Sequence, residues 1–543
     1  MNVDVRLPIE AQLAFLDAAD PSEARAEAVG AKAANLMRMA SAGLPVPPGF
    51  VIPTEVCAAY HEAGGGLGAD VLSLIERGVR HVESATGLRF GASRRPLLVA
   101  VRSGAARSMP GMLDTILNVG LSDVTVRGLL RSTGDPVFVW DSYRRLIESH
   151  AEVVAGCPST LFGEARAAAL ERADVPTLAE LDVAELRQLV DDMKSIYLAA
   201  TGEVFPQDPM QQLCEAVEAV FRSWSSDRAV AYRALEGLTD LLGTAVTVQS
   251  MVFGNQGVSS GSGVGFTRDP ATGENRLYVD FLLNAQGEDV VGGRQTTGDP
   301  EPLIAAVPGL AHELQLLRRT LESLFGDAQD FEFTVEDGKL WVLQSRTAKR
   351  TPWAALQIAC DLVDEGVLDE ATAFDRIASL DLDRVARLRL DTTSAEVPIG
   401  RGTAASAGVA AGVIALDAVT ARERAERGEP VILVRDDAST DDIAAFSVCA
   451  GLLTARGART SHAAVVARQL GMACVVNCAD LTIDVHTRRA TLGSCQLHEG
   501  EAITLDAAEG AVYQGILDLV EERPNELVKR VRTWRHDECG AGR

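Results

Sequence analysis

The residues from Thr454 to Arg468 carry the pattern with the clearest chemical meaning in the chain. Thr460 and Ser461 precede an apolar-periodic run, which is a helix-start signal, so we expect His462 in the first turn of a helix. Free amide groups at a helix start favour phosphate, and neutral imidazole is a nucleophile near pH 7. The pattern indicates a histidine that can carry a phosphoryl group. Taken alone, a histidine among alanines and valines is more often a packed core residue.

Two further segments place a cation beside small residues. Lys32 follows Gly30 by two residues at the start of an Ala-rich helical run, where glycine lets the backbone approach a ligand closely. Arg102 follows the apolar run from Pro96 to Val101 and opens a loop rich in arginine, serine and glycine. Both segments suit phosphate. Each is equally compatible, by itself, with an ordinary solvated surface.

The segment from Met251 to Pro270 is rich in glycine and serine and includes Ser262 and Gly263. Small residues of this kind are typical of a hairpin tip, where free amide groups can curl around an anion. We therefore expect a phosphate-binding tip here, with a plain flexible hairpin as the alternative.

The segment from Asp330 to Arg346 alternates apolar and polar residues around Asp337-Gly338, which predicts a β-hairpin. A two-residue loop would leave Glu332 and Gln344 on opposite faces, whereas a three-residue loop would bring them onto one face with Asp330 and Arg346. The second register offers oxygen ligands suited to Mg²⁺ and a guanidinium for phosphate. A solvated polar face is the alternative.

Composition limits the classes of protein that can carry these groups. The chain has 543 residues, 47% of them hydrophobic, and a net charge of −25, so it forms globular cores, in about three or four domains. The acidic balance argues against a nucleic-acid partner. No apolar run reaches the roughly 18–20 residues of a membrane span, and the start lacks a signal-peptide layout, so we predict no membrane partner and a cytoplasmic location. Nine thinly spread cysteines do not predict a disulfide framework.

The elements that must position these groups change character along the chain. A mixed α/β pattern up to about residue 120 gives way to a helical pattern at about 121–240 and then to a β-rich, Gly-rich region at 243–346. A charged helical stretch follows, and a new Gly-rich and Val-rich α/β pattern begins near Ile399. These changes predict an α/β multidomain fold.

Five segments in this order together resemble the pyruvate, phosphate dikinase family of PEP-utilising enzymes: Gly30–Leu36, Val101–Met112, Gly261–Arg268, Asn284–Val291 and Arg459–Arg468. The related phosphoenolpyruvate synthases fit less well, because the Ser-Met-Pro-Gly-Met and Asn-Ala-Gln-Gly-Glu-Asp runs look like the dikinase form. The resemblance extends to about residue 520. It implies an ATP-grasp nucleotide-binding domain at 1–350 with a helical insertion at about 121–240, a helical linker at 351–395, a swivelling phosphohistidine domain at 396–520 and a tail at 521–543.

The resemblance also implies roles for single residues. His462 would be the residue phosphorylated, with Lys32 and Arg102 as the other catalytic groups, and Glu332 and Gln344 would hold Mg²⁺. Thr460 matches a position that is phosphorylated for regulation in some plant-type dikinases, and we do not assume that regulation here. The implied contacts to ATP are Lys32, Arg102, Gly111, Ser262, Gly263, Glu288, Glu332, Gln344 and Arg346.

The implied reaction moves the β-phosphoryl group of ATP to His462 and the γ-phosphoryl group to inorganic phosphate, leaving AMP and pyrophosphate. The histidine then passes its phosphoryl group to pyruvate, which makes the chain a phosphotransferase with paired acceptors. Full dikinases continue into a TIM barrel that binds pyruvate, and such a barrel needs about 250 residues. Because the sequence ends at Arg543, we expect the barrel in a separate subunit.

Two alternatives stay open beside this hypothesis. The same histidine chemistry can serve a different acceptor, or the chain can be a catalytically silent nucleotide-binding regulatory paralogue. The sequence departs from the family pattern at Ala458, where a glycine is usual, at Ser262, where a threonine is usual, and at 292–297. Retention of Lys32, Arg102 and His462 argues against the silent paralogue.

Overall fold

The computed structural model describes residues 12–17, 25–107, 109, 115–235, 237–291, 304–305, 307–391, 396–406, 408–438, 442–457 and 462–537. By compactness the chain divides into two units, one formed by Met1–Gln256 with Trp341–Gln344 and the other by Gly257–Leu340 with Ser345–Arg543. The domain boundaries expected at 350, 395 and 520 stay predictions. No helix in the described part of the chain has the length and apolar character that crossing a membrane requires. The cytoplasmic location also stays a prediction.

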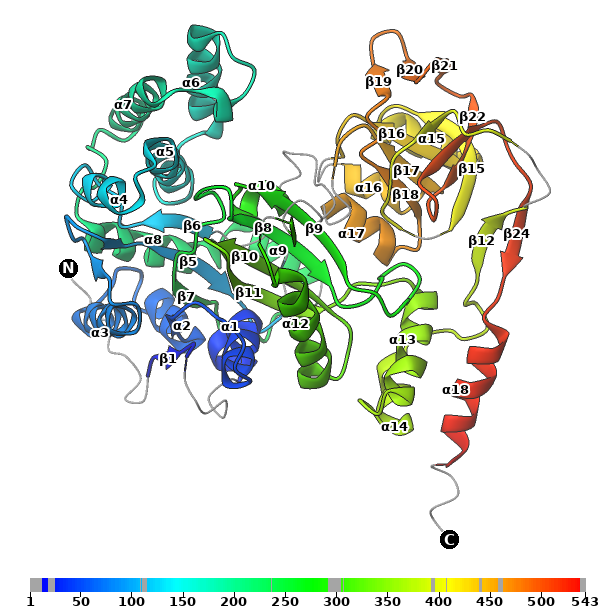
Figure 1. Cartoon of the computed structure of the whole chain (residues 1–543), viewed down its shortest axis with the longest axis horizontal. Helices are drawn as coiled ribbons and strands as arrows, with labels where there is room; N and C mark the ends of the chain where they lie inside the picture. Colours follow the sequence, from blue (N-terminus) through cyan, green and yellow to red (C-terminus); the bar gives the residue numbers. More distant parts are fainter. Residues whose placement is uncertain are drawn as a thin grey trace. The chain divides into compact units, whose positions relative to one another are not determined.

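The first unit is built on a five-stranded antiparallel sheet with the order β1-β2-β7-β5-β6 (Figure 1). Its strands are β1 (Ala14–Phe15), β2 (Gly49–Ile52), β5 (Val99–Gly104), β6 (Thr115–Val119) and β7 (Ala245–Ser250). A separate pair of short parallel strands, β3 (Arg89–Phe90) and β4 (Pro96–Leu97), precedes β5 in the sequence.

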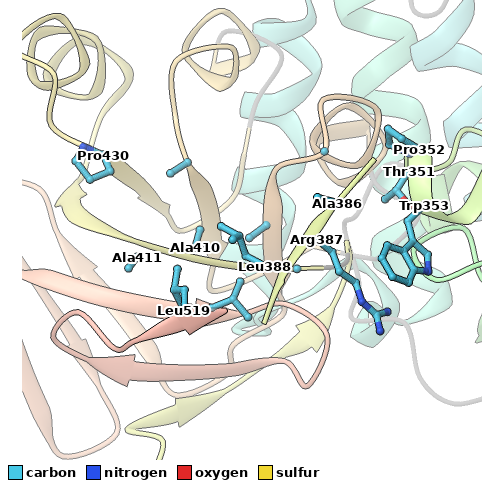
Figure 2. A pocket seen from close by; sticks show the side chains of 15 residues that line it. Thr351, Pro352, Trp353, Ala386, Arg387, Leu388, Ala410, Ala411, Pro430 and Leu519 are labelled. Carbon is cyan, nitrogen blue, oxygen red and sulfur yellow. The ribbon is translucent and has the colours of Figure 1, made fainter. Parts of the chain in front are cut away.

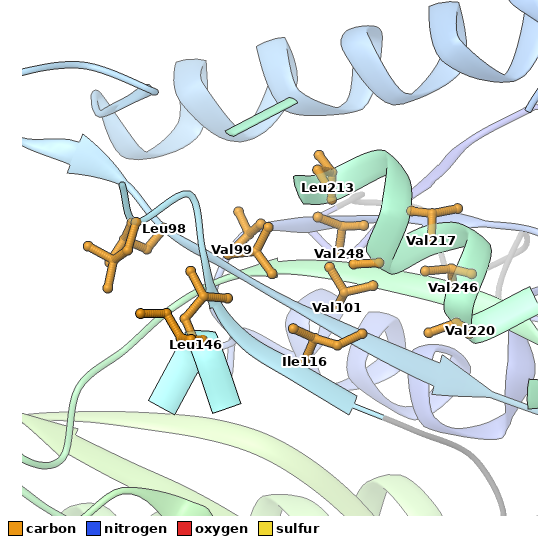
Figure 3. Packing of buried hydrophobic residues seen from close by; sticks show 14 of the residues in the cluster. Leu98, Val99, Val101, Ile116, Leu146, Leu213, Val217, Val220, Val246 and Val248 are labelled. Atoms are coloured by element: carbon orange, nitrogen blue, oxygen red, sulfur yellow. The ribbon is translucent and has the colours of Figure 1, made fainter. Parts of the chain in front are cut away.

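The core of this sheet explains why β5 is held firmly. Helix α8 (Pro209–Ser223) presents Leu213, Val217 and Val220 at helical spacing, and all three are fully buried. They pack over Val101 of β5 and Val246 of β7 (Figure 3). Fully burying a side chain of this size contributes about 1.5–3 kcal/mol. The strand that carries Arg102 therefore rests on a dense apolar layer.

The remaining helices of the first unit come in two groups. Helices α1 (Ala26–Ser41), α2 (Thr54–Glu62) and α3 (Ala69–Thr86) precede β5 in sequence and are drawn in blue in Figure 1. The other group fills the segment for which the sequence predicts a helical pattern: α4 (Thr125–Thr133), α5 (Pro136–Val153), α6 (Ser159–Ala173), α7 (Val183–Thr201), α8 and α9 (Asp227–Leu235). Aspartates at the helix starts of α5, α7 and α8 accept hydrogen bonds from backbone N–H groups, as expected of N-caps.

The second unit begins with a sheet in the order β11-β10-β8-β9, in which β8 pairs antiparallel with both β10 and β9. Its strands are β8 (Gly261–Phe266), β9 (Tyr278–Leu283), β10 (Gln329–Glu336) and β11 (Lys339–Thr347), and the helices α10 (Gly287–Val291) and α12 (Leu310–Phe325) accompany them. Residues 341–344 of β11 are counted with the first unit.

A helical cluster and a two-stranded ribbon follow. Helices α13 (Pro352–Asp364) and α14 (Glu370–Ile377) lead to β12 (Arg387–Leu390), which pairs antiparallel with β24 (Leu519–Glu522). The last described helix, α18 (Asn525–Asp537), packs on α13 and α14 through the buried Val531 and Trp534 (Figure 1). The end of the described chain is thus anchored to the linker helices.

Between β12 and β24 lies an α/β region with an eight-stranded sheet in the order β13-β23-β22-β15-β16-β17-β18-β14. Four central strands, β15 (Val409–Ala415), β16 (Val431–Arg435), β17 (Gly451–Thr454) and β18 (Ala473–Val476), run parallel. The other elements of this region are β13 (Gly400–Arg401), β14 (Thr403–Ala404), α15 (Ala418–Glu426), α16 (Ile443–Phe446), α17 (His462–Gln469), β19 (Leu481–Asp484), β20 (Arg489–Leu492), β21 (Cys495–His498), β22 (Ala502–Asp506) and β23 (Ala511–Gln514). The near-continuous apolar composition of β16, β17 and β18 is typical of strands buried on both faces.

Candidate functional site

The backbone around Gly30 sets the position of Lys32. Gly30 interrupts α1 with φ 79° and ψ 152°, and the next residue, Ala31, donates its N–H to the carbonyl oxygen of Ala105 at 2.9 Å. A Cβ atom on Gly30 would lie 2.2 Å from the carbonyl oxygen of Gly104. Only glycine allows this approach. The helical segment that carries the exposed Lys32 is thereby tied to the end of β5, as the Gly-x-Lys spacing suggests.

Arg102 lies near the end of the same strand. It is partly buried, and its Nη1 donates to the carbonyl oxygen of Leu343 at 3.3 Å. The next residue along β11 is Gln344, which is 8% exposed. Within the first unit the structure therefore connects three elements that carry expected site residues: the start of α1 after its break, the end of β5 and the middle of β11.

The glycines of β8 have a packing role, and the predicted hairpin tip is wrong for this segment. Ser262 and Gly263 lie inside a fully buried strand, and the Ser262 hydroxyl is 3.0 Å from the hydroxyl of Thr334 on β10. A Cβ atom at Gly263 would lie 2.6 Å from the ring of Phe333. Small side chains at alternate positions of β8 leave room for phenyl rings. The phosphate contacts expected for Ser262 and Gly263 stay predictions.

The turn between β10 and β11 also differs from the register that the metal hypothesis needed. It has two residues, Asp337 and Gly338, with φ 47° and 78°, as in a type I′ hairpin. The three-residue loop is therefore wrong. Nevertheless, Arg346 Nε donates to both carboxylate oxygens of Asp330 at 2.8 Å. The alternation of burial along β11 is interrupted at Gln344 and Ser345, which are consecutive and both buried. Counting alternate residues from the turn therefore does not tell which face of the sheet Gln344 and the residues after it occupy.

Asp330 is the buried acid of this group. Burial raises its pKa to about 6, even though the guanidinium of Arg346 acts to lower it. Burial alone would lower the pKa of Arg346, but the carboxylates of Asp330 and Glu332 outweigh this effect and raise it. Glu332, two residues along β10, is partly exposed. Asp330 and Glu332 thus place two carboxyl groups close to the guanidinium of Arg346.

The donor chemistry of Glu332 and Gln344 fits a magnesium ion, which prefers carboxylate and amide oxygens. Their strands also supply the carboxylate of Asp330. Among the residues that the structure describes, no three or more His, Cys, Asp or Glu side chains are gathered as a preformed metal site.

His462 is the first residue of α17, in agreement with the predicted helix start. It follows the carboxyl end of β17, and Gly457 in the intervening loop has φ 121°, a conformation that favours glycine. Beyond His462 the helix buries Ala463, Ala464 and Ala467 against the sheet. The histidine thus stands at the end of α17 where unpaired amide groups collect.

Arg468 anchors the other end of this helix. It is 2% exposed, and its guanidinium donates to the carbonyl oxygen of Ala405 at 2.8 and 3.2 Å. The guanidinium carbon also lies 5.1 Å from the ring centroid of Phe266 on β8. Arg468 is the last residue of the Arg459–Arg468 segment, and the pattern of that segment does not indicate this structural role.

Sequence reasoning missed a second buried arginine, Arg268. This side chain is fully buried and makes two hydrogen bonds of 3.0 Å to Glu322 and one of 2.6 Å to Glu365. It links the end of β8 to α12 and to the end of α13. No hydrophobic period marks such a residue, because the pattern predicts an exposed position for a charged side chain.

Three expectations fall outside what the structure describes. Gly111 and Thr460 lie outside the described residues, and the side chain of Glu288 in α10 is likewise not described. The described part of the expected site therefore comprises Lys32, Arg102 and Gln344 in one unit, and Ser262, Gly263, Glu332, Arg346 and the backbone of His462 in the other.

Comparison with protein families places two models on this chain. The model described as "Pyruvate phosphate dikinase, AMP/ATP-binding domain" matches residues 26–86 and 67–303. The model described as "PEP-utilising enzyme, mobile domain" matches residues 427–510, a range that contains β17, His462 and α17. The mixed α/β multidomain fold, with a nucleotide-binding part followed by a mobile domain of the PEP-utilising type, agrees with the prediction.

Individual relatives carry the same name. The chain is 43% identical over 509 residues to pyruvate, phosphate dikinase of Clostridium symbiosum, covering 93% of this chain and 58% of that protein. It is 44% identical over 491 residues to pyruvate, phosphate dikinase 2 of Zea mays, covering 90% and 56%. It is 42% identical over 489 residues to the chloroplastic pyruvate, phosphate dikinase 1 of Arabidopsis thaliana, covering 90% and 51%.

The chain spans little more than half the length of these relatives. The family model for the nucleotide-binding part alone covers half of the chain, and the mobile-domain model surrounds the histidine. On these matches the chain belongs to the pyruvate, phosphate dikinase family.

Proposed function

We propose that this chain is an ATP-dependent phosphotransferase that phosphorylates its own His462 and passes the phosphoryl group to pyruvate. The observation that carries the proposal is the position of His462 at the first residue of α17, within the matched mobile domain. A phosphohistidine there would gain from the free amide groups of the helix end. Lys32 on α1 and Arg102 near the end of β5 supply the charges that a nucleoside triphosphate needs.

In this proposal the first half-reaction consumes ATP and inorganic phosphate. The β-phosphoryl group forms a bond with an imidazole nitrogen of His462, and the γ-phosphoryl group leaves for inorganic phosphate, so AMP and pyrophosphate are released. Phosphoryl transfer relies on positioning and on charge stabilisation. Lys32, Arg102 and Arg346 are the residues of this chain proposed to hold the phosphate oxygens.

Glu332 and Gln344 are the proposed ligands of magnesium, an ion that neutralises developing charge on the transferred phosphoryl oxygens when it is bound. Ser262, Gly263, Gly111 and Glu288 are proposed as further nucleotide contacts.

The second half-reaction needs an acceptor site. We propose that pyruvate is bound outside residues 1–543, either by a separate barrel subunit or by further residues of a longer polypeptide. The mobile-domain match supports this step, because a phosphohistidine that serves two sites must move between them. A different acceptor for the same phosphohistidine is the competing proposal.

The first half-reaction can be tested with the chain as it stands. The purified protein is incubated with Mg²⁺ and with ATP labelled separately at the β or the γ position, with and without inorganic phosphate. The proposal predicts β-label on the protein, and phosphate-dependent release of AMP and of pyrophosphate containing the γ-label. Transfer of the γ-label to the protein would contradict dikinase chemistry. ATP binding without any transfer would instead favour the silent regulatory paralogue.

A further inference from the structure

Two segments of the first unit that touch each other carry four exposed arginines. One segment, residues 88–95, contains β3 and leads into β4, and the other, residues 124–134, contains α4 (Figure 1). Neither segment includes an aspartate or a glutamate, although acidic side chains outnumber basic ones 76 to 51 in the whole chain. We call the four exposed arginines the arginine surface: Arg94, Arg95, Arg127 and Arg131.

The two segments meet at Gly128. This residue is buried on α4, and a Cβ atom added to it would lie 2.8 Å from the carbonyl oxygen of Ser93 and 3.1 Å from the backbone nitrogen of Arg94. Glycine therefore lets the helix lie directly on the loop. Because Arg94 adjoins this contact on the loop and Arg127 adjoins it on the helix, arginines of both segments lie beside the same contact.

One side of α4 carries the helical part of the surface. Arg127 and Arg131 are four residues apart and Val124 lies three residues before Arg127, so these side chains share one stripe of the helix. Val126 and Leu129 face the core instead. Because Val124 is 57% exposed, the stripe combines an accessible apolar side chain with two cations.

The loop part of the surface is presented from a constrained backbone. Arg95 has a φ of 47°, in the left-handed region that a residue with a side chain rarely adopts. Such a conformation persists only where the surrounding structure imposes it. The next two residues are buried and form β4, which pairs with β3 on the other side of the loop.

The arginine surface lies at the end of β5 that is opposite to Arg102. Val99, the first residue of β5, pairs with Val119, the last residue of β6, and the chain runs from there to α4. Arg102 pairs with Thr115, at the start of β6. A partner on the arginine surface would therefore not compete directly with a phosphate group on Arg102.

Acidic side chains near the surface are already engaged. Asp123, just before α4, pairs with Lys194. Asp135, just after α4, accepts a hydrogen bond of 3.0 Å from a backbone N–H at the start of α5. Glu83 accepts one of 3.0 Å from Arg89, the remaining arginine of residues 88–95. The four arginines of the surface make no hydrogen bond or ion pair with any residue in the described part of the chain.

Arg387 in the second unit provides a contrast. It lies at a cavity of about 410 Å³, where its Nε donates to Glu522 at 2.9 Å and its guanidinium carbon is 4.2 Å from the centroid of the Trp353 ring (Figure 2). The charge of Arg387 is thus matched within the chain. The arginine surface holds four charges without such a match, which favours a partner that brings anions.

We propose that the arginine surface docks a short acidic segment of a partner protein, with its carboxylates on the four guanidiniums and an apolar side chain of the segment against Val124. A planar guanidinium matches the two oxygens of a carboxylate. A long polyanion such as a nucleic acid fits less well, because it would continue past the surface over a chain with a net charge of −25. A short segment keeps its charge within the surface.

Docking is tested on the full chain with the labelled peptide Glu-Glu-Leu-Glu-Glu-Leu-Glu-Glu as the probe and fluorescence anisotropy as the readout. The comparison peptide has glutamine at every glutamate position. We expect saturable binding of the acidic peptide at low salt, a loss of affinity as salt is added, and no saturable binding of the glutamine peptide. Absence of saturable binding of the acidic peptide up to about 1 mM would overturn the proposal.

Two double variants reverse the charge of each half of the surface. Arg127→Glu with Arg131→Glu changes the helix, and Arg94→Glu with Arg95→Asp changes the loop, where aspartate tolerates a positive φ. Each double variant should weaken peptide binding about tenfold or more, because like charges then face each other. Thermal unfolding midpoints show whether each variant is folded, and a defect in one leaves the other to decide.

The matched control is Arg319→Glu with Arg422→Glu, at exposed positions of α12 and α15 in the second unit. It changes the net charge by the same amount and should weaken peptide binding by less than about threefold. Equal losses in the control and in the two surface variants would show that only net charge matters and would refute the surface.

A labelled oligothymidylate of similar length separates the two kinds of polyanion. The proposal predicts that it binds more weakly than the acidic peptide at the same salt concentration. Tighter binding of the oligothymidylate, lost in the same double variants, would overturn the protein partner in favour of a single-stranded nucleic acid.

Discussion

At the scale of single residues, the fold orients the guanidinium of Arg102, a residue that we propose holds phosphate oxygens. The guanidinium is partly buried at the end of a strand and bonded to the carbonyl oxygen of Leu343, so its orientation is set before any ligand arrives. A pre-oriented charge loses little conformational entropy on binding. This arrangement distinguishes Arg102 from the many exposed arginines of the chain.

We predict that Arg102→Gln lowers the rate of β-label transfer to the protein by about 100-fold or more, the size of effect seen when one charge-stabilising group is removed from an active site. Arg127→Gln, at an exposed position of α4, provides the matched control and should leave the rate unchanged. Rates are measured at saturating ATP with quenched-flow sampling. A loss below threefold for Arg102→Gln would remove this residue from the catalytic group.

Residue-level prediction from the sequence succeeded where local chemistry decides the outcome. The helix start at His462 follows from Thr460 and Ser461 before an apolar run, and α17 begins there. The sequence left open whether the loop has two or three residues, and the structure has the two-residue turn at Asp337 and Gly338 that Asp-Gly ordinarily prefers. Gln344 and Ser345 are consecutive and both buried, and no pattern in the sequence indicates this interruption.

At the scale of elements, the contact between α1 and the end of β5 positions the helical segment that carries Lys32, a residue that we propose holds phosphate oxygens. The break at Gly30 redirects α1 so that its continuation starts beside the end of β5. The sequence indicated this use of glycine. For β8 the glycines also suggested the approach of a ligand, but in the structure they make room for phenyl rings from other strands. A Gly-rich run cannot by itself reveal whether a ligand or a side chain fills the space.

Gly30→Ala should destabilise the first unit by about 2–4 kcal/mol, because its Cβ would clash with the carbonyl oxygen of Gly104 and φ is positive. The variant should also bind ATP more weakly, since Lys32 is displaced. Gly43→Ala is the control: Gly43 has a similar φ of 81° but open space around its Cβ position, so only backbone strain of about 1 kcal/mol is expected. Denaturant unfolding and ATP titration measure the two effects. Equal losses in the two variants would show that the close approach contributes nothing.

The helices between β6 and β7 contain an ion-pair group whose pH dependence is predictable. Asp141 accepts hydrogen bonds of 2.7 Å from both Arg144 and Arg145. Burial raises its pKa, but the two guanidiniums outweigh burial and bring the pKa down to about 2. A carboxyl whose pKa is lower in the folded state stabilises the fold above its unfolded pKa, and this contribution is lost as the pH falls through the folded value.

Asp141→Asn should therefore lower the free energy of unfolding by about 2 kcal/mol at pH 7, and the difference from wild type should stay constant between pH 5 and pH 8. It should shrink only below about pH 4. Asp174→Asn, an exposed position in the same group of helices, should have an effect below about 0.5 kcal/mol. A difference that falls steadily from pH 8 to pH 5 would mean that the Asp141 carboxyl does not titrate as the ion pairs require.

At the scale of the whole molecule, the order of patterns along the sequence foretold much of the architecture. The helical segment, the following β-rich and Gly-rich sheet, and the later parallel α/β region all appear in the structure. The buried arginines could not be foreseen, because Arg268 and Arg468 are held by partners distant in sequence, such as Glu322 and Ala405. Family membership now rests on matches to both parts of the chain.

The central claim is that ATP phosphorylates His462, and the most direct measurement locates the phosphoryl group. The chain is incubated with Mg²⁺, phosphate and β-labelled ATP, digested at alkaline pH and sequenced by mass spectrometry, alongside His462→Asn and the control His498→Asn from β21. We predict acid-labile label on the peptide that contains residue 462, in the wild type and in His498→Asn, and none in His462→Asn. Label that survives acid, or label of equal amount in His462→Asn, would contradict the account.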